Sequence, residues 1–180
     1  SEYLYGVTYG NGLFVTVGWS GTILTSSDGN SWNERTSGTS VYLRGVTYGN
    51  GLFVTVGDEG TILTSPDGIS WTKRTSGTSE YLDGVTYGNG LFVTVGWSGT
   101  ILTSSDGTSW TQRNSGTSEY LYGVTYGNGL FVTVGDYGTI LTSTDGNLWS
   151  QSNSGTSELL FEVTYGNGLF VTVGWSGTIL

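Results

Sequence analysis

The chain contains no cysteine, no histidine and no methionine among its 180 residues. Without cysteine it has no disulfide framework, no thiol nucleophile and no thiolate ligand for a metal ion. Without histidine it lacks the imidazole that serves many enzymes as a general base or a metal ligand. These absences exclude most familiar hydrolase mechanisms, and we expect a protein that uses neither a metal ion nor a cofactor.

Basic residues are also scarce. The net charge is −9, with five Lys and Arg residues against 14 Asp and Glu residues. Proteins that bind nucleic acid normally carry a basic stripe, and anionic membrane surfaces attract the same residues. No apolar run approaches the roughly 20 residues of a membrane-spanning helix. We therefore expect neither nucleic acid nor a membrane as a partner.

Proline occurs once, whereas glycine occurs 32 times. Abundant glycine without a collagen-like triplet period is typical of many tight turns, which favours an all-β fold over disorder. The hydrophobic content of 36% and the aromatic content of 14% are enough for one globular domain with a buried core.

A 39-residue repeat occupies the whole chain, with full copies at 1–39, 40–78, 79–117 and 118–156 and a partial copy at 157–180. A period near 40 is typical of β-propeller blades and of helical solenoids. The copies show no helical periodicity, because short β-branched and aromatic runs alternate with glycine. The repeat therefore indicates a single all-β domain.

Each full copy predicts four antiparallel strands. In the first copy these are Tyr3–Tyr9, 13–18, 22–26 and 32–36, and the Asn-Gly pair within Gly10–Gly12 predicts a tight hairpin turn. The second strand is apolar on both faces, so it needs a neighbouring sheet on each side. The sequence therefore predicts a β-propeller, most simply of five blades with an incomplete fifth. A β-solenoid is the second possibility.

Four copies share the pattern Ser-x-Asp-Gly-x-x-Trp, at Ser26–Trp32, Ser65–Trp71, Ser104–Trp110 and Ser143–Trp149. This pattern resembles the Asp-box turn of bacterial neuraminidase repeats, although it is one residue shorter between Asp and Trp. Together with the preceding "GTILTS", the repeat resembles the blades of photosystem II assembly-factor-like propellers. The resemblance implies a folding element between the third and fourth strands, remote from any active site, and favours an extracellular location.

The box residues suit a structural role. The carboxylate can accept backbone N–H groups, glycine takes a positive φ, and tryptophan buries a large ring. One carboxylate per loop is too few for calcium, which binds six to eight oxygens. We assign this role to Asp28 and Trp32, Asp67 and Trp71, Asp106 and Trp110, and Asp145 and Trp149.

A sialidase, as the resemblance implies, would need an arginine triad, a Tyr nucleophile with a carboxylate partner, and a separate acid. Arg35, Arg74 and Arg113 occupy one position of the outer strand in three copies, so we expect them to be spread around the rim. An active site breaks the symmetry of a repeat protein, and this chain barely does so. We predict no catalytic residues.

The copies differ in the fourth strand and the loop before it, and at two further places, which the up-and-down strand order puts at one end of a propeller. One is the fifth residue of each copy, and the other is the turn between the second and third strands, where Trp and Asp alternate. The alternation suggests duplication of a 78-residue, two-blade unit. These turns either bind a ligand or are exposed and vary freely. The candidate ligand-binding residues are Tyr5, Arg44, Asp83, Tyr122 and Phe161 in the first group, and Trp19, Asp58, Trp97, Asp136, Tyr137 and Trp175 in the second.

Two functional hypotheses follow. The first is a lectin-like module with several equivalent sites. Trp19, Trp97 and Trp175 would stack on sugar rings, and the neighbouring carboxylates would accept hydrogen bonds from sugar hydroxyl groups. Several weak sites would then gain affinity through avidity. The second is a scaffold that binds a protein partner through its aromatic residues and Arg44. A recently amplified or engineered symmetric propeller with no specific ligand also fits the residues.

The incomplete fifth copy leaves the closure of the ring open. We expect five blades to close within one chain. Alternatively, two chains join head-to-tail into a homodimeric ring of about nine or ten blades, since an exposed strand edge invites pairing.

Overall fold

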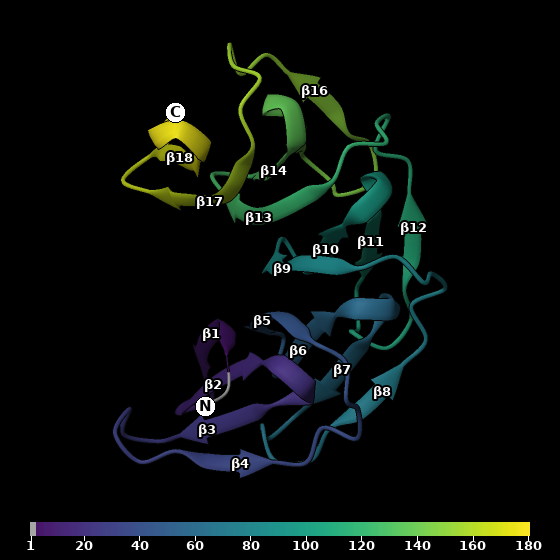
Figure 1. Cartoon of the computed structure of the whole chain (residues 1–180). Helices are drawn as coiled ribbons and strands as arrows, with labels where there is room; N and C mark the ends of the chain where they lie inside the picture. The colour runs from purple at the N-terminus through teal and green to yellow at the C-terminus, as the bar shows by residue number, and fades with distance from the viewer. Residues whose placement is uncertain (1–2) are drawn as a thin grey trace.

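The computed structural model describes residues 3–180, which form five β-sheets, one from each copy of the repeat (Figure 1). The first four sheets have four antiparallel strands in chain order, and the fifth has two. The predicted all-β propeller with an incomplete fifth blade is confirmed. No helix among residues 3–180 is long and apolar enough to cross a membrane.

Each blade consists of strands (β) and one short 3-10 turn (η); blade one has β1 Leu4–Gly10, β2 Leu13–Gly18, η1 Trp19–Gly21, β3 Ile23–Ser26 and β4 Asn33–Arg35, and blade two has β5 Leu43–Gly49, β6 Leu52–Gly57, η2 Asp58–Gly60, β7 Ile62–Ser65 and β8 Thr72–Arg74. Blade three has β9 Leu82–Gly88, β10 Leu91–Gly96, η3 Trp97–Gly99, β11 Ile101–Ser104 and β12 Thr111–Arg113. Blade four has β13 Leu121–Gly127, β14 Leu130–Gly135, η4 Asp136–Gly138, β15 Ile140–Ser143 and β16 Ser150–Ser152, and blade five has β17 Leu160–Gly166, β18 Leu169–Gly174 and η5 Trp175–Gly177.

The hairpin between the first two strands of a blade has the predicted geometry. Asn11 and Gly12 have φ angles of 49° and 75°, and the register pairs Gly10 with Leu13. Two consecutive positive φ angles define the type I′ turn, which matches the twist of the flanking strands. The same turn recurs in all five copies.

The turn between the second and third strands is held by the backbone. In η1 the N–H of Thr22 donates to the carbonyl of Trp19 at 2.9 Å. Gly21 has a φ of 74°, and a Cβ added there would lie 2.1 Å from the carbonyl oxygen of Thr39. Only glycine fits, because the segment that leads to the next blade passes directly against this turn.

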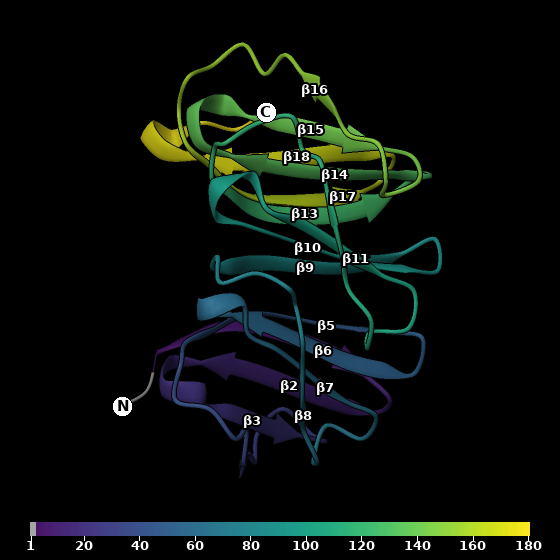
Figure 2. The ribbon, with the colours of Figure 1, turned by 90° about the vertical axis from the view of Figure 1, so that its right-hand side faces the viewer.

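Neighbouring blades pack face to face, as the stacked sheets in Figure 2 show. One apolar cluster joins Val15, Val17 and Ile23 of blade one to Leu43 and Phe53 of blade two. Equivalent clusters join the second blade to the third and the third to the fourth. Each inner blade therefore has both apolar faces covered by its neighbours, as the sequence of the second strand predicts.

The first strands of the blades form the inner ring, and β1, β5, β9, β13 and β17 lie side by side in that order. Glycine permits this close approach. A Cβ on Gly45 would lie 2.7 Å from the carbonyl oxygen of Asp83, and one on Gly84 would lie 2.6 Å from that of Tyr122. The fifth copy has Glu162 at this position.

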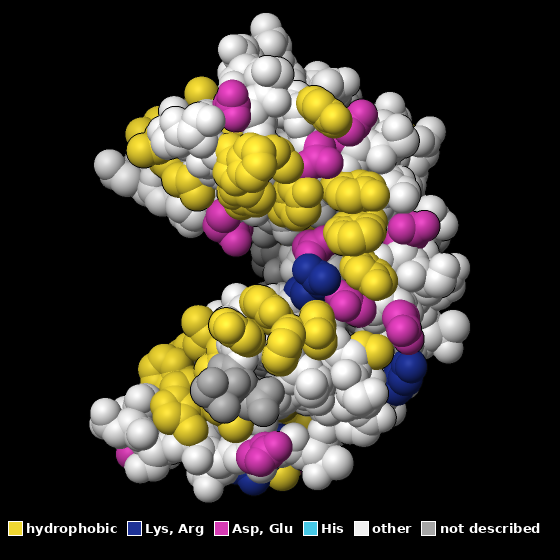
Figure 3. All heavy atoms as spheres, in the orientation of Figure 1, with side chains coloured by type: hydrophobic (Ala, Val, Ile, Leu, Met, Phe, Trp, Pro, Cys, Tyr) yellow, Lys and Arg dark blue, Asp and Glu magenta, His cyan; other side chains and the backbone are white. Residues whose placement is uncertain are grey.

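The expectation that five blades close within one chain is wrong. Blades one and five face each other across a wide notch (Figures 1 and 3). Val7 in β1 is 65% exposed and Val173 in β18 is 45% exposed, whereas their equivalents Val46 and Val134 are buried. Glycines at the inner edge and large side chains farther out fix the angle of each joint. Five blades at that angle form an open arc.

The turn glycines give a matched test of this backbone packing. Gly99 has a φ of 67°, and its added Cβ would lie 2.1 Å from the carbonyl oxygen of Thr117, whereas Gly90 has a φ of 76° with open space around it. We expect Gly90→Ala to cost about 1–2 kcal/mol from its left-handed backbone alone. Gly99→Ala should cost more than about 4 kcal/mol, since the backbone must also move. Equal losses in urea unfolding would contradict the packing described.

Candidate functional site

A cavity of about 310 Å³ lies on the axis of the arc, inside the ring of inner strands. Its lining comes from all five blades. Among the predicted ligand-binding residues it includes Tyr5, Arg44, Asp83 and Tyr122. The fifth residue of each copy thus belongs to the central cavity in the first four blades.

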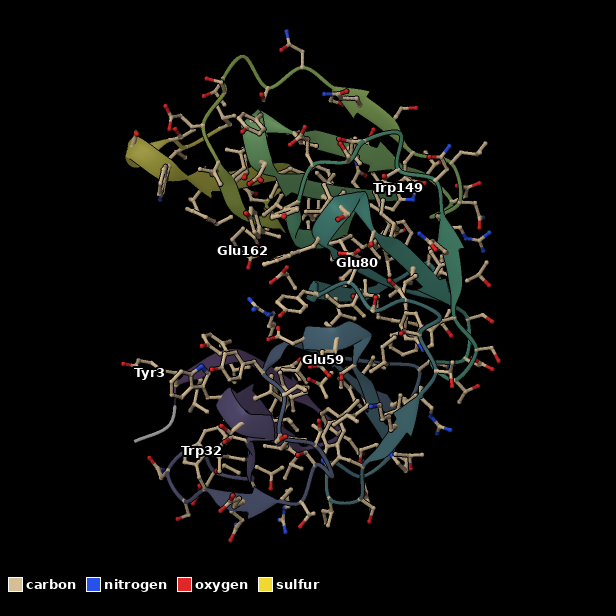
Figure 4. All side chains as sticks on the ribbon, turned by 45° about the vertical axis from the view of Figure 1, so that its right-hand side comes forward. Tyr3, Trp32, Glu59, Glu80, Trp149 and Glu162 are labelled. Atoms are coloured by element: carbon tan, nitrogen blue, oxygen red, sulfur yellow. The ribbon has the colours of Figure 1, made fainter. Side chains whose placement is uncertain are left out.

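The fifth blade contributes a residue that the sequence analysis did not single out. Glu162 lines the cavity from β17, and Figure 4 shows it at the inner edge of the fifth blade beside the opening. The predicted residue Phe161 is exposed next to it, with its ring 5.7 Å from that of Tyr122. The signal was present in the sequence, since Glu162 replaces the glycine found in the other four copies.

Arg44 links the second and third blades at this cavity. Its Nη1 atom donates to Asp83 Oδ1 at 3.1 Å, and its Nε atom donates to Asp58 Oδ1. The guanidinium also lies 5.4 Å from the centre of the Tyr81 ring, within the range of a cation–π contact. One guanidinium between two carboxylates leaves the cluster with a negative charge.

Asp83 is the most perturbed carboxylate of the cluster. Burial raises its pKa to about 6, although Arg44 acts in the opposite direction. Its Oδ2 atom is buried and has no hydrogen bond to any group in the described part of the chain. Buried polar atoms are normally paired. The Trp97 side chain, like Arg44, acts to lower this pKa, but the Oδ2 atom itself lacks the pairing that a buried carboxylate normally has.

The two variable positions of the fourth blade are also paired. The hydroxyl of Tyr122 donates to Asp136 Oδ1 at 2.8 Å. Burial and this hydrogen bond raise the pKa of Tyr122 well above its usual range, so the hydroxyl keeps its proton. Blades two and four carry Asp in the turn after the second strand, and in both the fifth residue of the copy donates a hydrogen bond to that Asp: Arg44 to Asp58 and Tyr122 to Asp136. Such pairing does not fit two positions that vary independently.

Two of the three turn tryptophans have a ring face covered by the next blade. The Trp97 and Tyr120 rings are stacked 4.7 Å apart with an interplanar angle of 5°. Trp19 stacks on Tyr42 at 5.2 Å. Trp175, in the fifth blade, is 60% exposed. On the face drawn in Figure 3, hydrophobic side chains form a curved band with acidic residues beside it.

The four turns with the pattern Ser-x-Asp-Gly-x-x-Trp are closed by local hydrogen bonds. Asp28 Oδ1 accepts the N–H groups of Asn30 and Ser31, both at 2.8 Å, and the indole of Trp32 donates to the carbonyl of Gly29 at 3.3 Å. The carboxylates of Asp67, Asp106 and Asp145 and the indoles of Trp71, Trp110 and Trp149 make the same contacts. These turns connect the third and fourth strands, away from the end that carries the variable turns.

The arginines of the outer strands do not reach the central cavity. Arg35, Arg74 and Arg113 each donate through Nε to a threonine hydroxyl of the adjacent strand, at 2.8–2.9 Å. They lie in β4, β8 and β12 of separate blades. Across residues 3–180, no three Asp, Glu, His or Cys side chains form a group that could hold a metal ion.

Larger hollows occur on the outer rim. The largest, of about 890 Å³, is lined mainly by Ser, Thr and Gly of the segment that links the first two blades. Similar hollows recur at the following blades. These hollows recur at equivalent places of successive blades, whereas the central cavity is lined by residues that differ between copies. The central cavity is therefore the candidate site.

No protein-family model matches the sequence, and no curated protein is similar to it. Solved structures share its fold. YCF48 from Cyanidioschyzon merolae has a TM-score of 0.74 and 16% identity over 99% of this chain and 66% of its own. YCF48 bound to D1 peptide has a TM-score of 0.74 and 19% identity, over 100% and 63% of the two chains.

A third structural neighbour comes from the nidogen/laminin complex, with a TM-score of 0.71 and 15% identity over 97% of this chain and 73% of the other. The chain spans about two thirds of the length of the two YCF48 chains. The TM-scores show a common propeller fold, and identities this low support no further likeness.

The lowered pKa values of the aspartates in these Ser-x-Asp-Gly-x-x-Trp turns predict how the stability of the protein changes in acid. Backbone N–H donors lower the pKa of Asp28 and Asp145 from 3.8 to about 2. A lowered folded-state pKa stabilises the fold above the unfolded value, and this stabilisation is lost as the pH falls from about 4 through 2. Asp145→Asn keeps the acceptor oxygen but does not titrate there. We expect its urea-unfolding free energy to fall less over this interval than that of the parent. Glu34→Gln, on the exposed face of β4, should match the parent, and an unchanged slope in Asp145→Asn would refute this explanation.

Proposed function

We propose that the chain is a non-catalytic protein-interaction module whose central cavity receives a basic side chain of a partner polypeptide. The observation that carries the proposal is the buried Oδ2 atom of Asp83, which has no hydrogen bond within the described residues. A lysine or arginine of the partner would supply the missing donor. Hydrogen bonds between charged groups are shorter and stronger than neutral ones.

The charge of the cavity supports a cationic group. Arg44 is its single basic residue, and Asp58, Asp83 and Glu162 lie on or beside the lining. A cavity with one sign of charge and walls of low dielectric constant concentrates ligands of the opposite sign. The net charge of −9 acts in the same direction over a longer range.

The aromatic lining supports a side chain with an aliphatic stem. Tyr5 and Tyr122 both line the cavity. Lysine and arginine pack their methylene groups on apolar surface while the charged end binds polar groups, and a cation over an aromatic ring is stabilised further.

The exposed aromatic residues on the face that carries η1–η5 offer a surface for the rest of the partner. Tyr137 is 72% exposed and Trp175 is 60% exposed. Tyrosine and tryptophan are enriched among the residues that contribute most to protein interfaces. The partner would therefore contact both the cavity and this rim.

The structural neighbours favour a polypeptide over a sugar. One is described as bound to a peptide and another comes from a protein complex. At their low identity, the fold is all that they show of this chain. The lectin-like hypothesis needs free tryptophan faces. Trp19 and Trp97 are already stacked on tyrosines of the next blade.

Display selection from a randomised peptide library, followed by fluorescence anisotropy with the selected peptides, tests the proposal. We expect lysine or arginine beside an apolar residue in the selected peptides. Asp83→Asn should weaken their binding at least tenfold, since truncating a buried charged contact costs about 2–5 kcal/mol. Asp145→Asn, in a Ser-x-Asp-Gly-x-x-Trp turn, is the matched control and should bind as the parent does. Peptides that bind Asp83→Asn and the parent equally would contradict the proposal.

The same peptides should show a defined pH dependence. The folded-state pKa of Asp83 is about 6, so the carboxyl is charged at pH 7.5 and mostly protonated at pH 5. Protonation removes the negative charge that attracts the basic group, and the affinity should fall as the pH decreases through about 6. Asp83→Asn should show a flatter profile over the same interval. An affinity that rises on acidification would contradict the assigned role of Asp83.

A further inference from the structure

The first blade exposes a face that every later blade buries. In β1, Leu4 and Val7 are 47% and 65% exposed, whereas Leu43 and Val46 in the same positions of blade two lie in the core. We call this surface of blade one the back face. It consists of Leu4, Val7, Tyr9 and Trp32, all of them exposed.

The fifth blade exposes the opposite surface, which every earlier blade buries against its successor. Val171 and Val173 in β18 are exposed, whereas Val54 and Val56 in the same positions of blade two are fully buried. We call this surface of blade five the forward face. It consists of Leu169, Val171, Val173 and Ile179, all of them exposed.

We propose that the forward face of blade five binds the back face of blade one of a second copy of this chain, head-to-tail. The two faces are the halves of an interface that the chain already forms between its own blades. In each internal joint a forward face packs on a back face, as Val54 and Val56 pack with Leu82 and Phe92. A second copy therefore presents the surface that each end of the arc lacks.

The exposed area is large enough to need a partner. Each face presents four large exposed apolar side chains whose equivalents at the joint of blades one and two pack in one cluster, and monomeric proteins rarely expose such patches. A stable interface needs about 800 Å² per partner. The edge of β18 is paired at Thr172, which exchanges two backbone hydrogen bonds with Leu180, and an apolar pocket of about 200 Å³ lined by residues that include Val132, Phe170 and Leu180 lies beside it.

Glu162 makes this joint differ from the internal ones. The glycines at its position approach the next blade so closely that an added Cβ would lie 2.6–3.1 Å from the backbone. Because Glu162 carries a full side chain there, a second copy must dock with a wider inner edge. A wider inner edge turns the joint through a smaller angle and leaves a carboxylate beside the contact. Glu162 therefore weakens the association without removing its apolar area.

Mass measurement by multi-angle light scattering over a range of concentrations tests the proposal. We expect the full chain to form particles of two or more 19.1 kDa chains, in a closed ring or an open head-to-tail series. A chain that stays monomeric up to about 1 mM, the limit of a weak complex, would overturn the proposal. In that case the notch is open in solution or is filled by a different protein.

Two charge variants separate head-to-tail docking from other arrangements. Val7→Lys alters the back face only and Val173→Lys alters the forward face only; both positions are exposed, so each variant should keep the parent's circular dichroism spectrum. Each variant alone should be monomeric. A mixture of the two should form a heterodimer, because the intact forward face of the first can bind the intact back face of the second.

Pairing of like faces gives a different pattern, and it would overturn the proposal. In that case one of the two variants would remain associated by itself, and mixing would add nothing. Association that neither variant weakens would also overturn it, since the contact would then lie elsewhere.

Glu162→Gly provides a gain-of-association test. It restores the residue of the other four copies and removes a carboxylate from the joint. We expect the self-association constant to rise about tenfold, equivalent to about 1.4 kcal/mol. Glu158→Gln, which removes a charge outside the two faces, is the control. Weaker association of Glu162→Gly would contradict the assigned geometry.

Discussion

The rest of the structure depends on the contact between neighbouring blades. No sheet of this chain can bury both of its apolar faces alone, so each one relies on the blade before it and the blade after it. The contact combines buried side chains such as Phe53 and Phe92 with glycines, such as Gly45, that bring backbone against backbone at the inner edge. The same apolar side chains and glycines recur at successive joints, so a substitution among them would weaken the packing of two neighbouring blades.

Residues that differ between copies lie outside the apolar clusters of this contact. They include the fifth residue of each copy and the turn that follows the second strand. In blades two and four these positions are joined by hydrogen bonds, from Arg44 to Asp58 and from Tyr122 to Asp136. The scaffold thus supplies a fixed ring of inner strands, and the variable residues give its cavity an asymmetric charge. A binding function is compatible with this division, because it needs few residues and does not disturb the joints.

Much of the fold was predictable because its signals are local. The Asn11–Gly12 turn, the strand order and the need for two covered faces all follow from short stretches of sequence. The open arc was not predictable, since the angle between blades is set by packing across whole faces. The ion pair of Arg44 with Asp83 joins residues in successive copies, and only their three-dimensional distance reveals it. Glu162 was visible as the one departure from glycine at its position, but only the structure shows that it lines the central cavity.

Matched core substitutions test most directly whether contacts between blades stabilise the fold. Phe14 and Phe92 occupy the same repeat position and lie 4.6 Å from Tyr9 and Tyr87 of their own blades, but Phe92 alone packs on a preceding blade. The Val173→Lys background keeps a second copy from covering Phe14. In urea unfolding there, Phe92→Ala should cost about 3–5 kcal/mol and Phe14→Ala clearly less. Equal costs would mean that contacts within a blade stabilise the fold, and would contradict this account.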